Sequence, residues 1–203
     1  MITRYPVLDM MKFRFLWILM VLAFAKALPV QAQQIKKEQE SRIESQEFPA
    51  ETEKWVKALS ENCKKLKFYK EVDGDKTSYE LKCKCEGRKR SIEFSEKGAL
   101  EDVEILTRNK KVAKAVLKRI QKSLDSITSK NRIEKIQEQY FLNSTSPAQL
   151  KLRINNSDLN GYELIVAFKE KRKIYRKELQ FDRYGKLISS RDIKRLEYDF
   201  LLF

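Results

Sequence analysis

The sequence predicts an α+β fold of two tandem units, each with one helix packed on a three- to four-stranded antiparallel sheet, after a cleaved signal peptide. The first observation is a repeat, since segment 94–100 returns at 181–187 with Phe, Gly and Leu in matching positions. The second is an upstream echo, because Tyr-Glu-Leu at 79–81 returns at 162–164. The third is that each set of alternating apolar residues follows a stretch of helical spacing. A small unit used twice accounts for all three.

Each copy of the repeat is typical of a strand, a tight turn and a second strand. Phe94 and Phe181 end the incoming strands, and Gly98 and Gly185 can adopt the positive φ that such turns require. The expected segments are a signal peptide at 1–32, a polar leader or edge strand at 33–47, a first unit at 48–106 and a second unit at 107–203.

The start of the chain has the pattern of an export signal. Lys12 and Arg14 precede an apolar run over 15–25, and small residues at Val30 and Ala32 favour cleavage after Ala32. A membrane anchor is the alternative, but the apolar run is shorter than the roughly 20 residues that span a bilayer. No cysteine lies near the cleavage point for lipid attachment. We therefore expect a periplasmic or secreted protein that does not span the membrane after cleavage.

The first unit opens with a helix and continues with four strands. Pro49 fits a first helical position, and an apolar stripe follows at helical spacing. This stripe consists of Thr52, Trp55, Val56, Leu59 and Cys63. From Lys65 the apolar period becomes two, with strands expected around Phe68, over 79–85, at 92–94 and over 99–105. We expect Trp55 to anchor the core of this unit.

The second unit repeats this order with one addition. A helix is expected over 109–127, followed by a strand that reaches Leu142. Residues 150–154 alternate between apolar and basic types and form an extra segment without a counterpart in the first unit. Strands are then expected over 162–168, over 174–181 and from Ile188 to the end of the chain.

Cys63, Cys83 and Cys85 predict one structural disulfide. Cys83 and Cys85 are two apart in a strand and share a face, against which the helix that ends near Cys63 should pack. An oxidising compartment then favours Cys63 paired with Cys83 or with Cys85, leaving one thiol over. Because the chain has no His and three thiols lack a fourth ligand, we expect no metal site and no cofactor.

The chain is basic, with a formal net charge of +14. The leader holds four basic residues and one acidic residue, so its removal lowers this charge to +11. A solvated sheet face is the plain interpretation, and export argues against nucleic acid as a partner. The candidates for a basic binding surface are Arg88, Lys89, Arg90, Lys171, Arg172, Lys173 and Arg176, with Lys169 and Lys177 beside them.

Catalysis is not predicted. Without His, a Ser or Cys nucleophile lacks its usual base. A carboxylate pair is the remaining possibility, but alternation places most of the candidate acids on a face that we expect to be solvated. These acids are Glu80, Glu93, Glu101, Asp102 and Glu104.

The pattern resembles the PepSY-like modules of exported bacterial proteins, which share a helix-on-antiparallel-sheet design with beta-lactamase inhibitory protein. Over 41–105 the resemblance is carried by Phe48-Pro49, Trp55, Tyr79-Glu80-Leu81, Ile92-Glu93-Phe94 and Gly98. Over 109–193 it is looser and is carried by Tyr162-Glu163-Leu164, Leu179-Gln180-Phe181 and Gly185. The resemblance implies an envelope module that binds or inhibits other proteins, and it implies no catalytic residues.

These observations favour an exported, non-catalytic binding module that engages a protein or peptide of the cell envelope. An exposed edge over 41–45 or 150–154 could accept an added strand. The alternative is a basic surface that binds an anionic envelope polymer or lipid.

Overall fold

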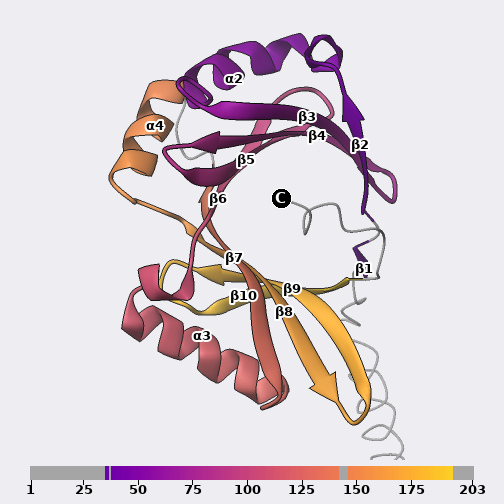
Figure 1. Cartoon of the computed structure of the whole chain (residues 1–203), viewed down its shortest axis with the longest axis vertical. Helices are drawn as coiled ribbons and strands as arrows, with labels where there is room; N and C mark the ends of the chain where they lie inside the picture. The colour runs from indigo at the N-terminus through magenta and orange to yellow at the C-terminus, as the bar shows by residue number, and fades with distance from the viewer. Residues whose placement is uncertain (1–34, 37, 142–145, 194–203) are drawn as a thin grey trace, which may run out of the picture. The chain divides into compact units, whose positions relative to one another are not determined.

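One continuous sheet dominates the computed structural model, which describes residues 35, 36, 38–141 and 146–193 (Figure 1). Ten strands of this part of the chain form the sheet; β2 to β10 are antiparallel neighbours in chain order, and β1 pairs in parallel with β10. The strands are β1 (Ile35–Lys36), β2 (Glu38–Ile43), β3 (Lys64–Asp73), β4 (Lys76–Cys85), β5 (Arg88–Ser95), β6 (Leu100–Leu106), β7 (Asn131–Phe141), β8 (Gly161–Glu170), β9 (Lys173–Asp182) and β10 (Leu187–Ile193). The helices of the same residues are α2 (Glu53–Leu59), α3 (Lys114–Ile127) and α4 (Pro147–Asn155), with short 3₁₀ turns η2 (Ser45–Glu47), η3 (Ala50–Thr52) and η4 (Asn109–Lys111).

The predicted fold class of two tandem units with separate sheets is wrong. β6 pairs with β7, with Asp102 opposite Phe141 and Leu106 opposite Gln137, so the two expected sheets are one. Apolar periodicity identifies a strand but does not say which strand lies beside it. The expected signal peptide at 1–32, residue 142 and the chain beyond residue 193 lie outside the described residues.

The extra segment at 150–154 is a helix and not an extended strand. Ser146 caps α4, since its Oγ accepts a hydrogen bond from the Gln149 N–H at 3.4 Å, and Pro147 follows in the first turn. Leu150 and Ile154 are buried one helical turn apart, while Leu152 is 61% exposed. Apolar residues at every second position also fit an i, i+4 pair, which explains the misassignment. The expected strand-accepting edge at 150–154 is therefore absent.

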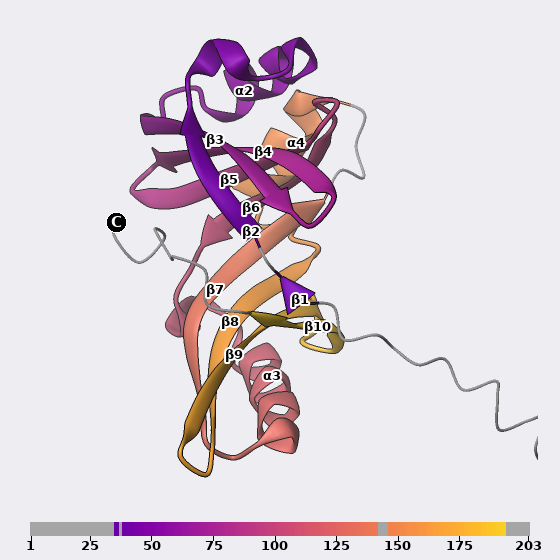
Figure 2. The same ribbon diagram turned by 90° about the vertical axis from the view of Figure 1, so that its right-hand side faces the viewer.

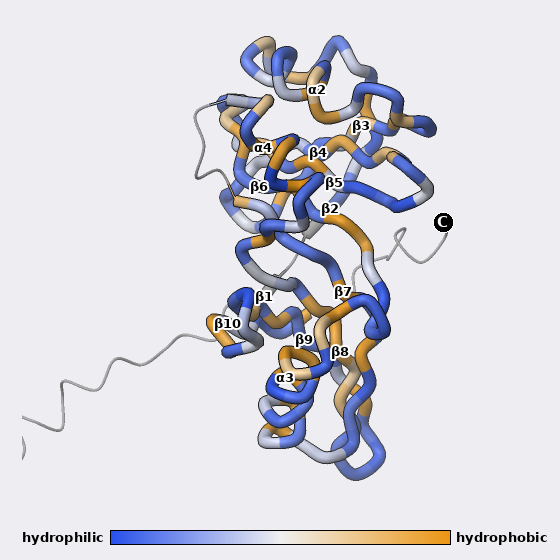
Figure 3. The backbone as a smooth tube through the Cα atoms, turned by 90° about the vertical axis from the view of Figure 1, so that its left-hand side faces the viewer, coloured by the Kyte–Doolittle hydropathy of each residue, from blue (hydrophilic) through white to orange (hydrophobic). Residues whose placement is uncertain are grey.

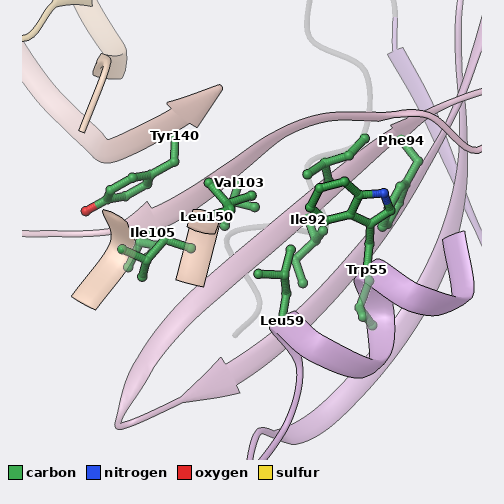
Figure 4. Close-up of a cluster of buried hydrophobic side chains, with 11 residues drawn as sticks. Trp55, Leu59, Ile92, Phe94, Val103, Ile105, Tyr140 and Leu150 are labelled. Atoms are coloured by element: carbon green, nitrogen blue, oxygen red, sulfur yellow. The ribbon is translucent and has the colours of Figure 1, made fainter. Parts of the chain in front are cut away.

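The first hydrophobic core lies between β4–β7 and the helices α2 and α4. Trp55 and Leu59 of α2 and Leu150 of α4 are buried against this part of the sheet (Figure 4). The ring of Phe48 packs edge-on against Phe68, with centroids 4.9 Å apart. The prediction that Trp55 anchors the core is confirmed. The strand residues of this core are Leu81, Ile92, Phe94, Leu100, Val103, Ile105 and Tyr140.

The second core lies between α3 and β7–β9. Ile120 and Leu124 of α3 are fully buried, and Leu159 packs against both cores. Figure 2 shows α3 beside β7–β9, with α2 and α4 beside β3–β6. The strand residues of the second core are Ile136, Tyr162, Leu164, Val166, Phe168, Leu179 and Phe181. The helices thus cover one face of the sheet in two places.

The repeated glycine turns both sit beneath a helix. Gly98 and Gly185 have φ of +77° and +82°. A Cβ on Gly98 would lie 2.9 Å from the Cβ of Pro49, and one on Gly185 would lie 2.8 Å from the carbonyl oxygen of Val116. Positive φ and a close helix together require glycine at these two positions.

Candidate functional site

Strand alternation gives the sheet a helix face and a polar face. Leu81, Ile92 and Leu164 point to the helices. The side chains that alternate with them along each strand therefore point to the opposite face. On this polar face, carboxylates and amides from neighbouring strands lie side by side. Its buried members are Glu71, Glu80, Ser91, Asp102, Glu104, Gln137, Gln139, Glu163 and Glu178.

The expectation that the acids of this face are solvated is wrong for Glu80, Asp102 and Glu104, which are 5%, 8% and 4% exposed. Glu93 and Glu101 are half-buried. Alternation identified the face correctly, but burial depends on strand register. Glu80 lies opposite Glu93, and Glu93 lies opposite Asp102, so three carboxylates occupy neighbouring positions on three strands. Cross-strand neighbours shield one another from water.

Glu40 and Glu80 share a lysine, and Glu71 lies beside them. The carboxylates of Glu40, Glu71 and Glu80 lie within 4.8 Å of one another. Lys82 Nζ lies 2.9 Å from Glu80 Oε2 and also pairs with Glu40. Burial acts to raise the pKa of Glu80, but the hydrogen bond with Glu71, the charge of Lys82 and the donated hydrogen bond of Ser91 lower this pKa to about 2. We call Glu40, Glu71, Glu80 and Lys82 the Lys82 cluster.

Glu93, Asp102 and Glu104 form a second group, the three-acid cluster. Their carboxylate oxygens also lie within 4.8 Å of one another. Burial raises the pKa of Glu93 well above its usual value, and the charges of Asp102 and Glu104 raise it further. Burial, followed by the charge of Glu104, likewise raises the pKa of Asp102. Burial and neighbouring like charges both disfavour the ionised form of a carboxyl.

Basic residues gather at one end of the strands. Antiparallel pairing brings the end of β4 and the start of β5 together, with Lys84 opposite Lys89. Burial lowers the pKa of Lys89, and the charges of four other lysines lower it further. Like charges in close proximity disfavour the protonated form. The lysine group consists of Lys65, Lys67, Lys84, Lys89 and Lys135.

The β8–β9 hairpin forms a second basic feature at the same end of the strands. Its tip, residues 169–174, is exposed throughout and includes Ile174, which is 62% exposed. Figure 3 shows this tip as hydrophilic. We call residues 169–174 the basic hairpin. It contains the predicted surface residues Lys171, Arg172 and Lys173 together with Lys169.

Three further residues of the predicted surface, Arg88, Arg90 and Arg176, are engaged within the fold. Arg88 Nη1 pairs with Glu138 Oε2 at 3.1 Å. Arg90 Nη1 donates to the carbonyl oxygen of Leu59, 2.6 Å away at the end of α2. Arg176 makes two hydrogen bonds to Glu134, at 2.7 and 3.2 Å. The structure therefore separates the predicted basic surface into three arginines that bind within the fold and the exposed residues Lys89, Lys171, Arg172 and Lys173.

The sulfur atoms of Cys63 and Cys85 lie at disulfide distance, which selects one of the two expected pairings. Cys83 is the thiol left over; it is buried, with its Sγ 3.4 Å from that of Cys85. Burial raises the pKa of Cys83 to about 11, although the charge of Arg90 acts to lower it. The disulfide ties the residues after α2 to the end of β4.

Comparison with known proteins yields matches among solved structures alone. No protein-family model and no curated protein matches the chain. A putative periplasmic protein of Bacteroides eggerthii matches with a TM-score of 0.50 at 10% identity, over 75% of this chain and 94% of that one. A BLIP-like protein of Bacteroides fragilis matches with a TM-score of 0.47 at 18% identity, over 73% and 89%. A DUF2874 family protein of Bacteroides ovatus matches with a TM-score of 0.49 at 9% identity, over 71% and 86%.

The likeness is one of fold. At 10% identity, the Bacteroides eggerthii structure shows that this arrangement of sheet and helices occurs in another protein, and it assigns no site residue. The PepSY-like part of the expected resemblance has no counterpart in these matches. In the described residues, no helix has the length and apolar character needed to cross a membrane.

Sequence reasoning named Glu93, Asp102 and Glu104 among the candidate acids but did not predict that they form a group. Glu93 lies in one repeat of the strand pattern, and Asp102 and Glu104 lie after the glycine turn that follows it. The available signal was the hairpin itself, because a turn at Gly98 folds β6 back on β5 and brings acidic positions on one face together. Gln137 and Gln139 come from β7, whose pairing with β6 was not expected.

Proposed function

We propose that this chain is an exported, non-catalytic binding module of a bacterial envelope that engages an acidic segment of a protein or peptide partner. The observation that supports this most directly is the basic hairpin, where an exposed isoleucine lies among exposed cationic side chains. The pattern at 1–32 supports export, and the neighbour from Bacteroides eggerthii is itself described as a putative periplasmic protein.

Charge favours an acidic partner. The sequence carries a formal net charge of +14, and the basic hairpin presents Lys169, Lys171, Arg172 and Lys173 at exposed positions. Such a distribution attracts acidic surfaces over long range and raises association rates. The lysine group lies at the same end of the strands as the hairpin, so it adds to the field that an approaching partner meets.

The apolar content of the hairpin favours a protein or peptide over an anionic polymer. Ile174 is 62% exposed between Lys173 and the next residues of β9. A polymer of sugar or phosphate units gains from charge density and has little to gain from an isoleucine. A protein interface instead combines a buried apolar contact with a charged rim. Ile174 supplies the first and its basic neighbours supply the second.

A non-catalytic role agrees with the side chains at this surface. The chain has no His to serve as a base at neutral pH, and the hairpin carries cationic and apolar groups. Glu93 and Asp102, whose raised pKa values would suit acid–base chemistry, belong to the polar face and not to the hairpin. Binding is therefore the activity that this surface can perform by itself.

The test is capture of envelope proteins from the native cell by the chain and by charge variants. We expect K171E/K173E to lose the captured partner. The matched control, K110E/K118E, changes the net charge equally at exposed positions in η4 and α3, and it should retain the partner. Equal loss in both double variants would refute a hairpin site.

Salt and Ile174 separate the two partner classes. With a protein partner, I174S should weaken capture in both low and high salt because it removes an apolar contact. With an anionic polymer, binding should collapse in high salt and I174S should have no effect. A product released from an envelope substrate would instead show that the chain is an enzyme.

A further inference from the structure

The segment that leads into α3, and most of α3 itself, carries basic residues and no acid. Between Glu104 and Asp125 every charged residue is Lys or Arg. The basic hairpin lies elsewhere, at the tip of β8 and β9, so this second concentration of charge is not part of the surface proposed above.

Three lysines of α3 form a row on the side of the helix that faces away from the core. Lys114, Lys118 and Lys122 are exposed and four residues apart, so they share one face of the helix. Ile120 and Leu124 are fully buried on the opposite face. At a rise of about 1.5 Å per residue the row is about 12 Å long. In Figures 1 and 2 no other described element covers this side of α3.

Two further exposed lysines come directly before the helix, in η4. We call the combined surface the α3 basic face. It consists of Lys110, Lys111, Lys114, Lys118 and Lys122.

No acid of the described residues forms an ion pair with the α3 basic face. The exposed Lys151, by contrast, pairs with Glu61. Asp125 follows the row in α3, but its Oδ1 accepts hydrogen bonds from the side-chain amides of Gln121 and Asn131. The positive charge of the α3 basic face is therefore available to an anion from outside the fold.

The placement of these charges does not stabilise the helix. Lysines four residues apart repel one another along the row. The first turn of α3 has no acid, although the positive end of the helix dipole favours one, and three lysines lie at that end. The helix is held by its buried apolar residues instead. An external anion gives these lysines a role that folding does not.

An exposed aromatic residue borders the α3 basic face. Tyr184 is 62% exposed, and its carbonyl oxygen accepts a hydrogen bond from Arg119 Nη1 at 3.1 Å. Arg119 follows Lys118 directly in the helix. Tyrosine is enriched where a membrane meets water, because its ring is apolar and its hydroxyl is polar.

We propose that the α3 basic face binds an anionic membrane surface through the phosphate groups of its lipids. Clusters of about four to eight basic residues on a helix are typical of such binding, since each charge near the surface adds to the attraction. Tyr184 lies where it can enter the headgroup layer beside the lysines. The inference goes beyond the proposed function, since it concerns a different surface and a different ligand.

The composition of the α3 basic face favours a lipid surface over a protein. Protein interfaces are depleted of lysine and combine charge with a buried apolar contact. The large apolar residue that is exposed on α3, Ile127, is 36% exposed and lies at the far end of the helix. An extended row of ammonium groups instead matches an extended layer of phosphates, which requires no pocket.

Sedimentation with vesicles of phosphatidylglycerol and phosphatidylcholine tests the proposal, using the chain as recovered from a bacterium that exports it. We expect binding at low salt and release in about 1 M NaCl, where the Debye length is about 3 Å. K110E/K118E should lower the partition coefficient at least about tenfold, because two attractions become repulsions. K110R/K118R keeps both charges and should stay within about twofold of the wild type.

The matched control is K171E/K173E, which changes the net charge equally in the basic hairpin and should stay within about twofold. Vesicles of phosphatidylcholine alone control for the apolar run at 15–25 and should bind little protein. Y184S should weaken binding to the mixed vesicles by about threefold. Circular dichroism checks folding, and K110E/K118E should unfold at the same or a higher temperature than the wild type.

Three results would overturn the proposal. Equal losses in K110E/K118E and K171E/K173E would show attraction by net charge alone. Equal binding to neutral and mixed vesicles would show that lipid charge has no part. Binding of soluble polyphosphate that K110E/K118E abolishes, without binding to vesicles, would assign the face to a polymer. The hairpin capture experiment uses no vesicles and loses its partner in the other double variant, so the two proposals fail independently.

Discussion

Replacing Lys82 with methionine should leave buried carboxylates of the polar face without their cationic partner. Lys82 and Glu80 side chains are 19% and 6% exposed, with their charged atoms 2.9 Å apart. Methionine keeps much of the side-chain length but leaves Glu40 and Glu80 without the cation that both contact. Removing one partner of a buried ion pair costs about 3–5 kcal/mol, because the remaining charge is left in a poor solvent. Urea unfolding at pH 7 should show a loss of this size.

The pH dependence follows from the lowered pKa of Glu80. A carboxyl whose folded pKa lies below its unfolded value contributes stability above the unfolded pKa, and that contribution is lost as pH falls toward about 2. The gap between wild type and K82M should therefore be widest near pH 7 and shrink below about pH 4. The double variant K82M/E80Q should recover part of the loss at pH 7.

The control for this prediction is Lys76, which makes an ion pair of similar length in a more solvent-exposed position. Lys76 Nζ lies 2.8 Å from Glu101 Oε2, with side chains 60% and 34% exposed. K76M should cost at most about 1 kcal/mol, because exposed ion pairs contribute little. Equal losses in K76M and K82M, or a K82M loss that is independent of pH, would refute the reasoning about burial.

Three further predictions concern the turns, the thiol and the leader. G185A should destabilise more than G87A in thermal unfolding, since both positions have positive φ but only at Gly185 would a Cβ meet a backbone oxygen at 2.8 Å; equal effects would contradict the helix contact. Cys83 should react slowly with iodoacetamide in the folded chain at pH 8 and rapidly after denaturation, as followed by mass spectrometry, because its pKa is raised to about 11. Expression in a bacterium that exports proteins should yield a product whose first residue is Gln33 by N-terminal sequencing, whereas an intact leader would disprove cleavage after Ala32.

Local patterns predicted much of the fold. The apolar stripe that contains Trp55 and the alternation of Leu81 with Cys83 identify a helix and a strand, because each pattern arises from the geometry of its own backbone. The sequence also predicted the two turns that contain Gly98 and Gly185, since a positive φ favours glycine. The prediction of an extended segment at 150–154 was wrong because the apolar pattern of five residues fits a strand and a helical turn equally well.

The candidate sites were predictable only in part. Exposed lysines in a short hairpin are visible as a run in the sequence, which is why Lys171 and Lys173 were named in advance. Arg90 and Arg176 were predicted for the same basic surface, but they donate hydrogen bonds to the end of α2 and to Glu134. Their different role depends on how other elements pack and is not visible in the local sequence. The disulfide partner of Cys63 was likewise left open, because Cys83 and Cys85 share one face.

By itself the sequence determined which residues point to the same side of each strand, because that depends on a period of two within one segment. The tertiary structure decided that β6 pairs with β7 and so joins the expected sheets into one. It also decided that Glu93, Asp102, Glu104 and Gln137 converge, since register between strands is set by packing over long distances in the chain. Burial and the resulting pKa shifts exist only after that convergence.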